Sequence, residues 1–130
     1  MPEHMEAKFD VAKWDESSFD DQSDLPKLTR AVVVKQYSGD VEGRSTTEWL
    51  MAYADDGSAK FVGMERISGS INGREGSLVL RHAGSYEDGA AKGDLDVIEG
   101  SGSDALRSAA GSGQFLADPS GSVKLDLTFD

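Results

Sequence analysis

The sequence predicts an all-β fold, an eight-stranded antiparallel barrel of the up-and-down kind. Three observations predict it: 15 glycines, short runs that alternate apolar and polar residues, and the lack of long helical periodicity. Eight strands that close on themselves leave an interior just large enough for side chains or one small ligand. A compact sandwich is the alternative. The 130 residues are expected to form one domain, residues 1–130.

Each strand is predicted from a short run of alternating residues. In chain order the runs are residues 5–14, 29–39, 44–54, 59–71, 74–86, 92–100, 112–118 and 122–130. The first alternates Ala7, Phe9 and Val11 with polar residues, and the last is the clearest. Between them, residues 103–111 are expected to form one helical turn, which is too short to be stable alone.

The dipeptide Asn72-Gly73 is the strongest turn signal, because a type I′ hairpin turn needs positive φ at both central residues. A two-residue loop pairs Ile71 with Arg74. Counting outward, Gly63 then faces His82 and Glu65 faces Leu80. Directly paired residues share a face of the sheet, so Glu65 and His82 are predicted on the inner, apolar face. Glycine at position 63 is expected to leave room beside the imidazole.

Two further turns extend the predicted register. A three-residue loop at 55–57 pairs Met51 with Phe61 and Trp49 with Gly63, and places Tyr53 inside. It leaves Glu48 outside, as an ion-pair partner for Arg66. A loop at 119–121 is expected to pair Phe115 with Leu125 and Ala117 with Val123.

The composition excludes several classes of function. The net charge of −11 argues against binding to nucleic acid or to an anionic membrane, and without cysteine there is no thiolate chemistry. The acidic cluster at 14–24 is interpreted as a solubility feature. No cofactor and no metal site are expected, since one interior histidine with one carboxylate is too few and His4 is expected in a mobile terminus. Without a signal peptide or an apolar span, a cytoplasmic protein is expected.

Three segments resemble a known family: "YSGDVEGRSTTEWLMAY", "FVGMERISGSINGREGSLVLRHAGSY" and "GSGSDALRSAAGSGQF". The middle one carries F-x-G-x-E-R, Asn-Gly-Arg-x-Gly and His-x-Gly in order, and resembles the bacterial family called domain of unknown function 3224. That family is similar in fold to allene oxide cyclase. The resemblance implies an allene oxide cyclase-like barrel, which often assembles as a homo-oligomer, and carries no assigned activity. Ser103 and Asp104 depart from the family's glycine-rich turn.

These observations leave three functions open. The first is binding of a small apolar or amphipathic molecule inside the barrel, with Glu65 and His82 fixing its polar end. The second, implied by the resemblance in fold to allene oxide cyclase, is a cyclase or isomerase, in which the same two residues are the candidate catalytic pair. The third is a structural oligomer with a filled barrel. The candidate ligand-binding residues are Glu65, His82, Trp49, Met51, Tyr53, Phe61 and Tyr86. A core role is the alternative for each aromatic residue.

Overall fold

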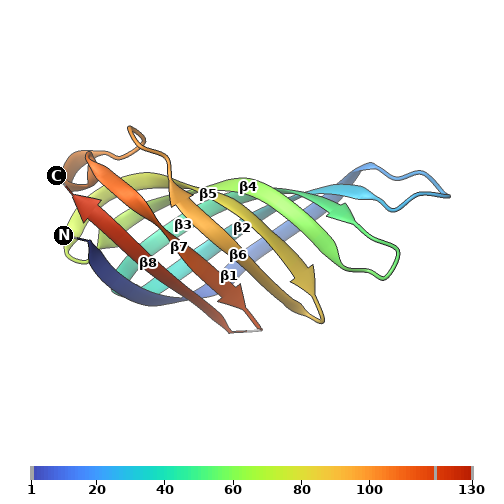
Figure 1. Ribbon diagram of the computed structural model, residues 1–130, viewed down its shortest axis with the longest axis horizontal. Coiled ribbons are helices and arrows are strands. Elements are labelled where there is room, and N and C mark those ends of the chain that lie inside the picture. The colour runs from blue at the N-terminus through green and yellow to red at the C-terminus, as the bar shows by residue number, and fades with distance from the viewer. Residues whose placement is uncertain (1, 119, 130) are drawn as a thin grey trace.

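The fold is a closed barrel of eight antiparallel strands, each hydrogen-bonded to the next along the chain, with the first and last strands pairing to close it (Figure 1). The computed structural model describes residues 2–118 and 120–129. The strands are β1 (Glu3–Asp20), β2 (Leu28–Gly39), β3 (Val41–Tyr53), β4 (Ala59–Ile71), β5 (Arg74–Glu87), β6 (Ala90–Val97), β7 (Ala109–Ala117) and β8 (Gly121–Phe129). The predicted fold class is confirmed, and every predicted run contributes a strand.

The β4–β5 hairpin has the predicted register. Asn72 and Gly73 have φ angles of 49° and 84°, as a type I′ turn requires. Gly63 pairs with His82 and Glu65 with Leu80. The local chemistry of two turn residues therefore fixes which face every side chain of the hairpin occupies.

The other two hairpins match the predictions in part. In the β3–β4 hairpin Met51 pairs with Phe61 and Trp49 with Gly63, as predicted. Glu48 is exposed, but its ion pair is with Arg30 on the neighbouring strand, at 3.0 Å, and not with Arg66.

The predicted register of the β7–β8 hairpin was wrong by two residues. Phe115 pairs with Val123 and Ala117 with Gly121, because β8 already begins at Gly121. The predicted loop residue Pro119 lies outside the described residues. A shift of two leaves every side chain on its predicted face.

Strand β1 is longer than predicted and contains an irregularity that changes which residues point inward. Val11 pairs with Lys35 but Lys13 pairs with Val34, so one extra residue is inserted, as in a β-bulge. Val11, predicted on the apolar face, is 47% exposed. Beyond the bulge Trp14 pairs with the buried Val33, so Trp14 and Glu16 now lie on the inner face, until a second register shift between Ser18 and Asp20.

The barrel has one covered end and one open end. At the covered end β6 stops short, and residues 98–106 run along the free edge of β5 instead, with Ser103 N–H donating to Ser77 O at 2.9 Å. The 3₁₀ turn η1 (Asp104–Leu106) buries Leu106 completely. At the other end the β1–β2 hairpin projects beyond the neighbouring strands (Figure 1).

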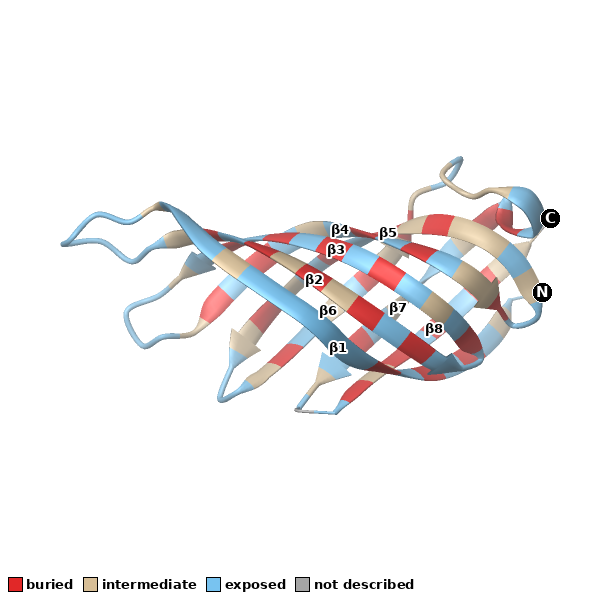
Figure 2. Ribbon diagram, turned by 180° about the vertical axis from the view of Figure 1, so that it is seen from behind, coloured by how far each residue is buried: buried red, intermediate tan, exposed pale blue. Residues whose placement is uncertain are grey.

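The inner face of the barrel is the hydrophobic core. Buried and exposed positions alternate along the strands (Figure 2), as expected for a sheet with one face on the core and one in solvent. The core includes Met5, Phe9, Ile67, Leu78, Leu95 and Leu125. In the part of the chain that the structure describes, no helix is long and apolar enough to cross a membrane.

Candidate functional site

The predicted pair of Glu65 and His82 meets on the inner face, as the register from the Asn72-Gly73 turn indicated. His82 Nε2 lies 2.8 Å from Glu65 Oε1, and both side chains are completely buried. The expected opening beside the imidazole was wrong. A Cβ at Gly63 would lie 2.7 Å from Cδ1 of Trp49 and would overlap the carbonyl oxygen of Glu48, so glycine admits the indole and the neighbouring backbone.

Trp49 determines which nitrogen of His82 carries the proton. The indole Nε1–H can only donate, and it lies 3.1 Å from His82 Nδ1. Nδ1 therefore accepts, which leaves the proton on Nε2 to be donated to Glu65. The result is a directed chain of hydrogen bonds from Trp49 through a neutral imidazole to the carboxylate.

Lys35 is the third charged residue of the interior, and the sequence analysis missed it. Its Nζ lies 3.6 Å from Glu65 Oε1, an ion pair in which both side chains are buried. The same nitrogen lies over three aromatic rings, those of Phe9 at 4.6 Å, Phe115 at 5.1 Å and Trp49 at 5.7 Å. The available signal was the alternation of β2, because Lys35 is in phase with the buried Val33 and Tyr37.

Electrostatics keep the interior carboxylate charged. Burial opposes the charge of Glu65, but the Lys35 ammonium and the hydrogen bond from His82 outweigh it and lower its pKa to about 2. Burial lowers the pKa of His82 and, against the attraction of Glu65, also that of Lys35. Burial raises the pKa of Tyr37 well above its usual range, so its hydroxyl stays protonated and donates to Glu65 Oε2 at 2.6 Å.

The interior around this network is filled. Glu65 is 0% and His82 1% exposed, so neither side chain borders solvent or a void that would hold a water molecule. Phe61 stacks on Trp49 with ring centroids 4.3 Å apart, which places two of the predicted ligand-binding residues in the packed layer. Within the described residues, Lys35 Nζ, Ser45 Oγ and Thr47 Oγ1 have no hydrogen-bond partner.

The remaining predicted residues gather at the open end of the barrel. Met51, Tyr53 and Tyr86 line a cavity of about 350 Å³ together with Trp14 and Glu16. The structure therefore divides the predicted site in two. One part is the sealed network of Glu65, His82, Trp49 and Phe61. The other is this cavity, which we call the mouth, and it is defined by the five residues that line it.

The carboxylate of Glu16 is the polar centre of the mouth. Its Oε2 accepts hydrogen bonds from the hydroxyls of Tyr53 at 2.6 Å and Thr29 at 2.7 Å. Its Oε1 accepts from Trp14 Nε1–H at 3.1 Å. Partial burial opposes the charge, but these hydrogen bonds outweigh it, so the pKa of Glu16 is lowered. Burial and the bond to Glu16 raise the pKa of Tyr53 to about 12.

Neither Trp14 nor Glu16 was predicted as a site residue. The acidic cluster at 14–24 was interpreted as solvated surface, and the bulge at Val11–Lys13 changes the alternation just before it. Trp14 is 43% exposed, yet its ring meets that of Trp49 edge-on, with centroids 5.4 Å apart. Trp49 thus contacts both the mouth and the sealed network.

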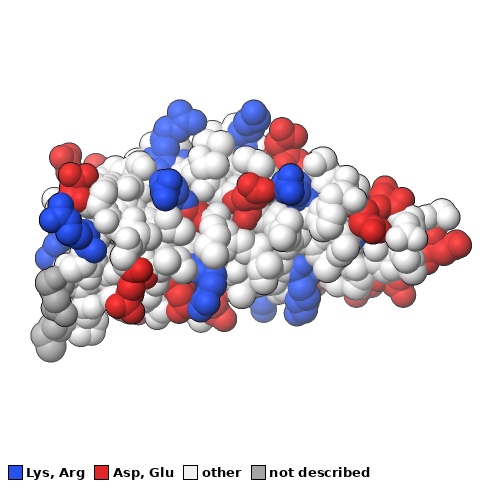
Figure 3. Space-filling model, turned by 90° about the horizontal axis from the view of Figure 1, so that it is seen from above, with Lys and Arg blue, Asp and Glu red and all other residues white. Residues whose placement is uncertain are grey.

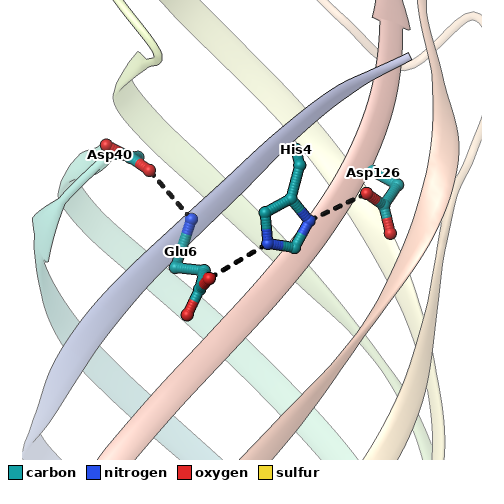
Figure 4. A network of polar contacts seen from close by, with 4 residues as sticks. All are labelled: His4, Glu6, Asp40 and Asp126. Atoms are coloured by element: carbon teal, nitrogen blue, oxygen red, sulfur yellow. Dashed lines mark hydrogen bonds and ion pairs between the residues drawn. The ribbon is translucent and has the colours of Figure 1, made fainter.

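The second histidine lies on the outer surface of the barrel (Figure 4). His4 Nδ1 lies 2.9 Å from Asp126 Oδ1, and Nε2 lies 3.1 Å from Glu6 Oε2. Hydrogen bonds to Asp126 and Glu6 raise the pKa of His4. His4 is held in β1, paired with β8, so its expected place in a mobile terminus was wrong.

Comparison with known proteins agrees with the resemblance in the sequence. A solved structure of a protein with unknown function from the DUF3224 family of Shewanella oneidensis MR-1 is similar, with a TM-score of 0.85 and 28% identity over 100% of this chain and 99% of that chain. No curated protein matches the chain. The family described as "Protein of unknown function (DUF3224)" matches residues 5–129, nearly the whole barrel. The chain belongs to the DUF3224 family.

Proposed function

We propose that the protein binds a small apolar or amphipathic molecule at the open end of its barrel. The observation that carries this proposal is the mouth itself, a cavity of about 350 Å³ lined by Met51, three aromatic side chains and one carboxylate. Small-molecule sites are typically concave and mostly apolar, with a few polar groups that orient the ligand. The mouths of β-barrels are among their usual places.

In this proposal Glu65 and His82 do not contact the ligand but hold one wall of the mouth in place. His82 holds the indole of Trp49 by a hydrogen bond, and Trp49 packs against Trp14 in the wall of the mouth. A buried network whose members are mutually bonded fixes the orientation of the groups it contacts. The pair would thus position the wall of the site, and the polar end of the ligand would meet Glu16 and Tyr53.

The burial of the interior pair favours binding over cyclase or isomerase chemistry. A general acid or base has to reach the proton it transfers, directly or through one water molecule. Glu65 and His82 are 0% and 1% exposed, and the aromatic layer of Trp49 and Phe61 lies beside them. A homo-oligomer and a cytoplasmic location stay predictions.

The proposal is tested with N-phenyl-1-naphthylamine, a neutral apolar probe whose fluorescence rises in apolar surroundings. Tyr86 is half-buried in the wall of the mouth, so Tyr86→Lys places a charge there without opening the core. We expect the wild-type protein to bind the probe and Tyr86→Lys to weaken binding by about tenfold or more, since the change removes an aromatic wall and places a lysine ammonium, attracted by Glu16, in the space that the neutral probe needs.

The control is Val62→Lys, which introduces the same charged side chain at a residue that is 56% exposed on the outer face. It is expected to bind the probe as the wild type does. No fluorescence increase with the wild type, or equal binding by wild type and Tyr86→Lys, would contradict the proposal.

A further inference from the structure

We propose that the molecule taken up at the mouth is an organic cation, a protonated amine or a quaternary ammonium with a small apolar body. Its charged nitrogen would lie against Glu16 among the rings of Trp14, Tyr53 and Tyr86. This inference rests on the proposed function and adds the chemical class of the ligand.

The first support is a carboxylate whose charge is not paired. Tyr53, Thr29 and Trp14 supply its three hydrogen bonds, and all three donors are neutral. Among residues 2–118 and 120–129, no lysine, arginine or histidine nitrogen forms a salt bridge with Glu16 within 4.0 Å. The donors orient the carboxylate and leave its negative charge for a cation in the mouth.

The second support is the aromatic lining. Trp14, Tyr53 and Tyr86 contribute three of the five side chains around the cavity. Aromatic faces attract cations within about 6 Å of the ring centre, and sets of aromatic side chains are a usual means of holding quaternary ammonium groups. An apolar body would contact Met51 at the inner side of the same cavity.

The interior of the same barrel already holds an ammonium group in this way. Lys35 Nζ lies 4.6 Å, 5.1 Å and 5.7 Å from the centroids of three aromatic rings and 3.6 Å from the carboxylate of Glu65. A tyrosine hydroxyl donates to that carboxylate at 2.6 Å, as Tyr53 does to Glu16. The mouth repeats these components of the Lys35 site around a cavity.

Lys27 shows that one of these rings attracts a cation. Its Nζ lies 4.9 Å from the centroid of the Tyr53 ring, and its charge also helps to lower the pKa of Glu16. The Lys27 side chain is exposed, so it is free to leave when another cation arrives. Lys27 would therefore act as a weak competitor of the ligand.

Acidic residues surround the open end and favour the approach of a cation. The turns and the adjoining strand ends at this end carry Asp20, Asp21, Asp24, Asp55, Asp56, Glu87, Asp88 and Asp118. Figure 3 shows acidic side chains at the tapered end of the molecule. Charge of one sign around a cavity raises the local concentration of the opposite ion.

The test uses two probes of the same shape, choline and 3,3-dimethylbutan-1-ol, in which carbon replaces the charged nitrogen. Their affinities are measured by calorimetry at fixed salt. We expect choline to bind about tenfold or more tightly than the alcohol, a difference of about 1.4 kcal/mol. Glu16→Gln keeps the size of the side chain and should remove most of this preference.

Two variants complete the design. Asp15→Asn is the matched control, because it removes the same charge from the exposed neighbour of Glu16, and it should leave the preference nearly unchanged. Lys27→Gln removes the competitor and should strengthen choline binding by about threefold, a size typical of exposed charge pairs. Glu16→Gln is therefore expected to weaken choline binding and Lys27→Gln to strengthen it.

The outcomes separate the inference from the proposed function. If N-phenyl-1-naphthylamine binds at the mouth but choline binds no tighter than the alcohol, the cation inference fails and the proposed function stands. If none of the three probes binds, both fail. If Asp15→Asn weakens choline binding as much as Glu16→Gln does, the attraction is general and the assigned site is wrong.

Discussion

The barrel contains two carboxylates in similar surroundings, and they differ in how their charge is balanced. Glu65 and Glu16 each accept a hydrogen bond from a tyrosine hydroxyl at 2.6 Å and lie beside aromatic rings. Glu65 is buried together with a cation, the Lys35 ammonium, whose Nζ lies 3.6 Å from Glu65 Oε1. Glu16 borders the mouth and is held by neutral donors. The first arrangement stabilises the fold, whereas the second leaves a charge available for a ligand.

The largest expected effect comes from removing the interior charge. Glu65→Gln leaves the Lys35 ammonium buried without a counter-charge, which typically costs about 3–5 kcal/mol of stability. Adding Lys35→Met removes that charge as well, so the double variant should be more stable than Glu65→Gln alone. Urea unfolding of the single and double variants measures this. If the double variant loses as much stability as the Glu65→Gln and Lys35→Met single variants together, the two residues are not coupled.

Acid should weaken the interior network next. The pKa of Glu65 is about 2 in the folded protein and 4.5 as its ordinary value, so the folded state binds the proton less readily. The contribution of ionised Glu65 to the free energy of unfolding is fully present above about pH 4.5 and is lost as pH falls towards 2. It amounts to something on the order of 3 kcal/mol by linkage. Urea unfolding between pH 7 and pH 3 should show about 2 kcal/mol of this loss, because the folded carboxylate is still mostly ionised at pH 3. A flat stability profile would be contrary to it.

Removing the charge at the mouth should have a smaller effect. Glu16→Gln keeps an acceptor for Tyr53 and leaves no buried cation without a counter-charge. We therefore expect it to lower the free energy of unfolding by about 1 kcal/mol or less. The comparison with Glu65→Gln in the same urea experiment is direct, because both replace a glutamate by glutamine. Equal costs for the two variants would mean that the two carboxylates do not differ in the way described.

The smallest effect concerns the two histidines, whose pKa values should be shifted in opposite directions. Burial lowers the pKa of His82 below 6.5, while hydrogen bonds to Asp126 and Glu6 raise that of His4 above 6.5. Proton NMR of the two imidazoles across pH 4–8 resolves both, since the chain has no other histidine. A higher midpoint for His82 than for His4 would contradict the neutral, buried state of His82.

Local chemistry explains which parts could be predicted from the sequence. The type I′ turn at Asn72-Gly73 sets the register by itself, so the position of Glu65 and His82 on the inner face followed from counting. Lys35 was missed because lysine is rarely buried without a partner, and its partner lies two strands away in the sheet. That pairing depends on the registers of two strand pairs, β2 with β3 and β3 with β4.

The mouth was harder to predict for a different reason. The extra residue between Val11 and Lys13 shifts the alternation of β1, and no turn residue marks it in the sequence. Without the bulge Trp14 and Glu16 would be assigned to the outer face. Met51, Tyr53 and Tyr86 could be predicted because their strands are regular up to the open end.

The two tryptophans allow the difference between the two regions to be measured in one experiment. The chain has only these two, with the Trp14 indole bonded to Glu16 and the Trp49 indole bonded to His82. A proton–nitrogen correlation spectrum therefore shows two indole signals, which Trp14→Phe assigns. On addition of choline we expect the Trp14 signal to shift markedly and the Trp49 signal only slightly. A larger shift at Trp49, or no shift at either, would contradict the account.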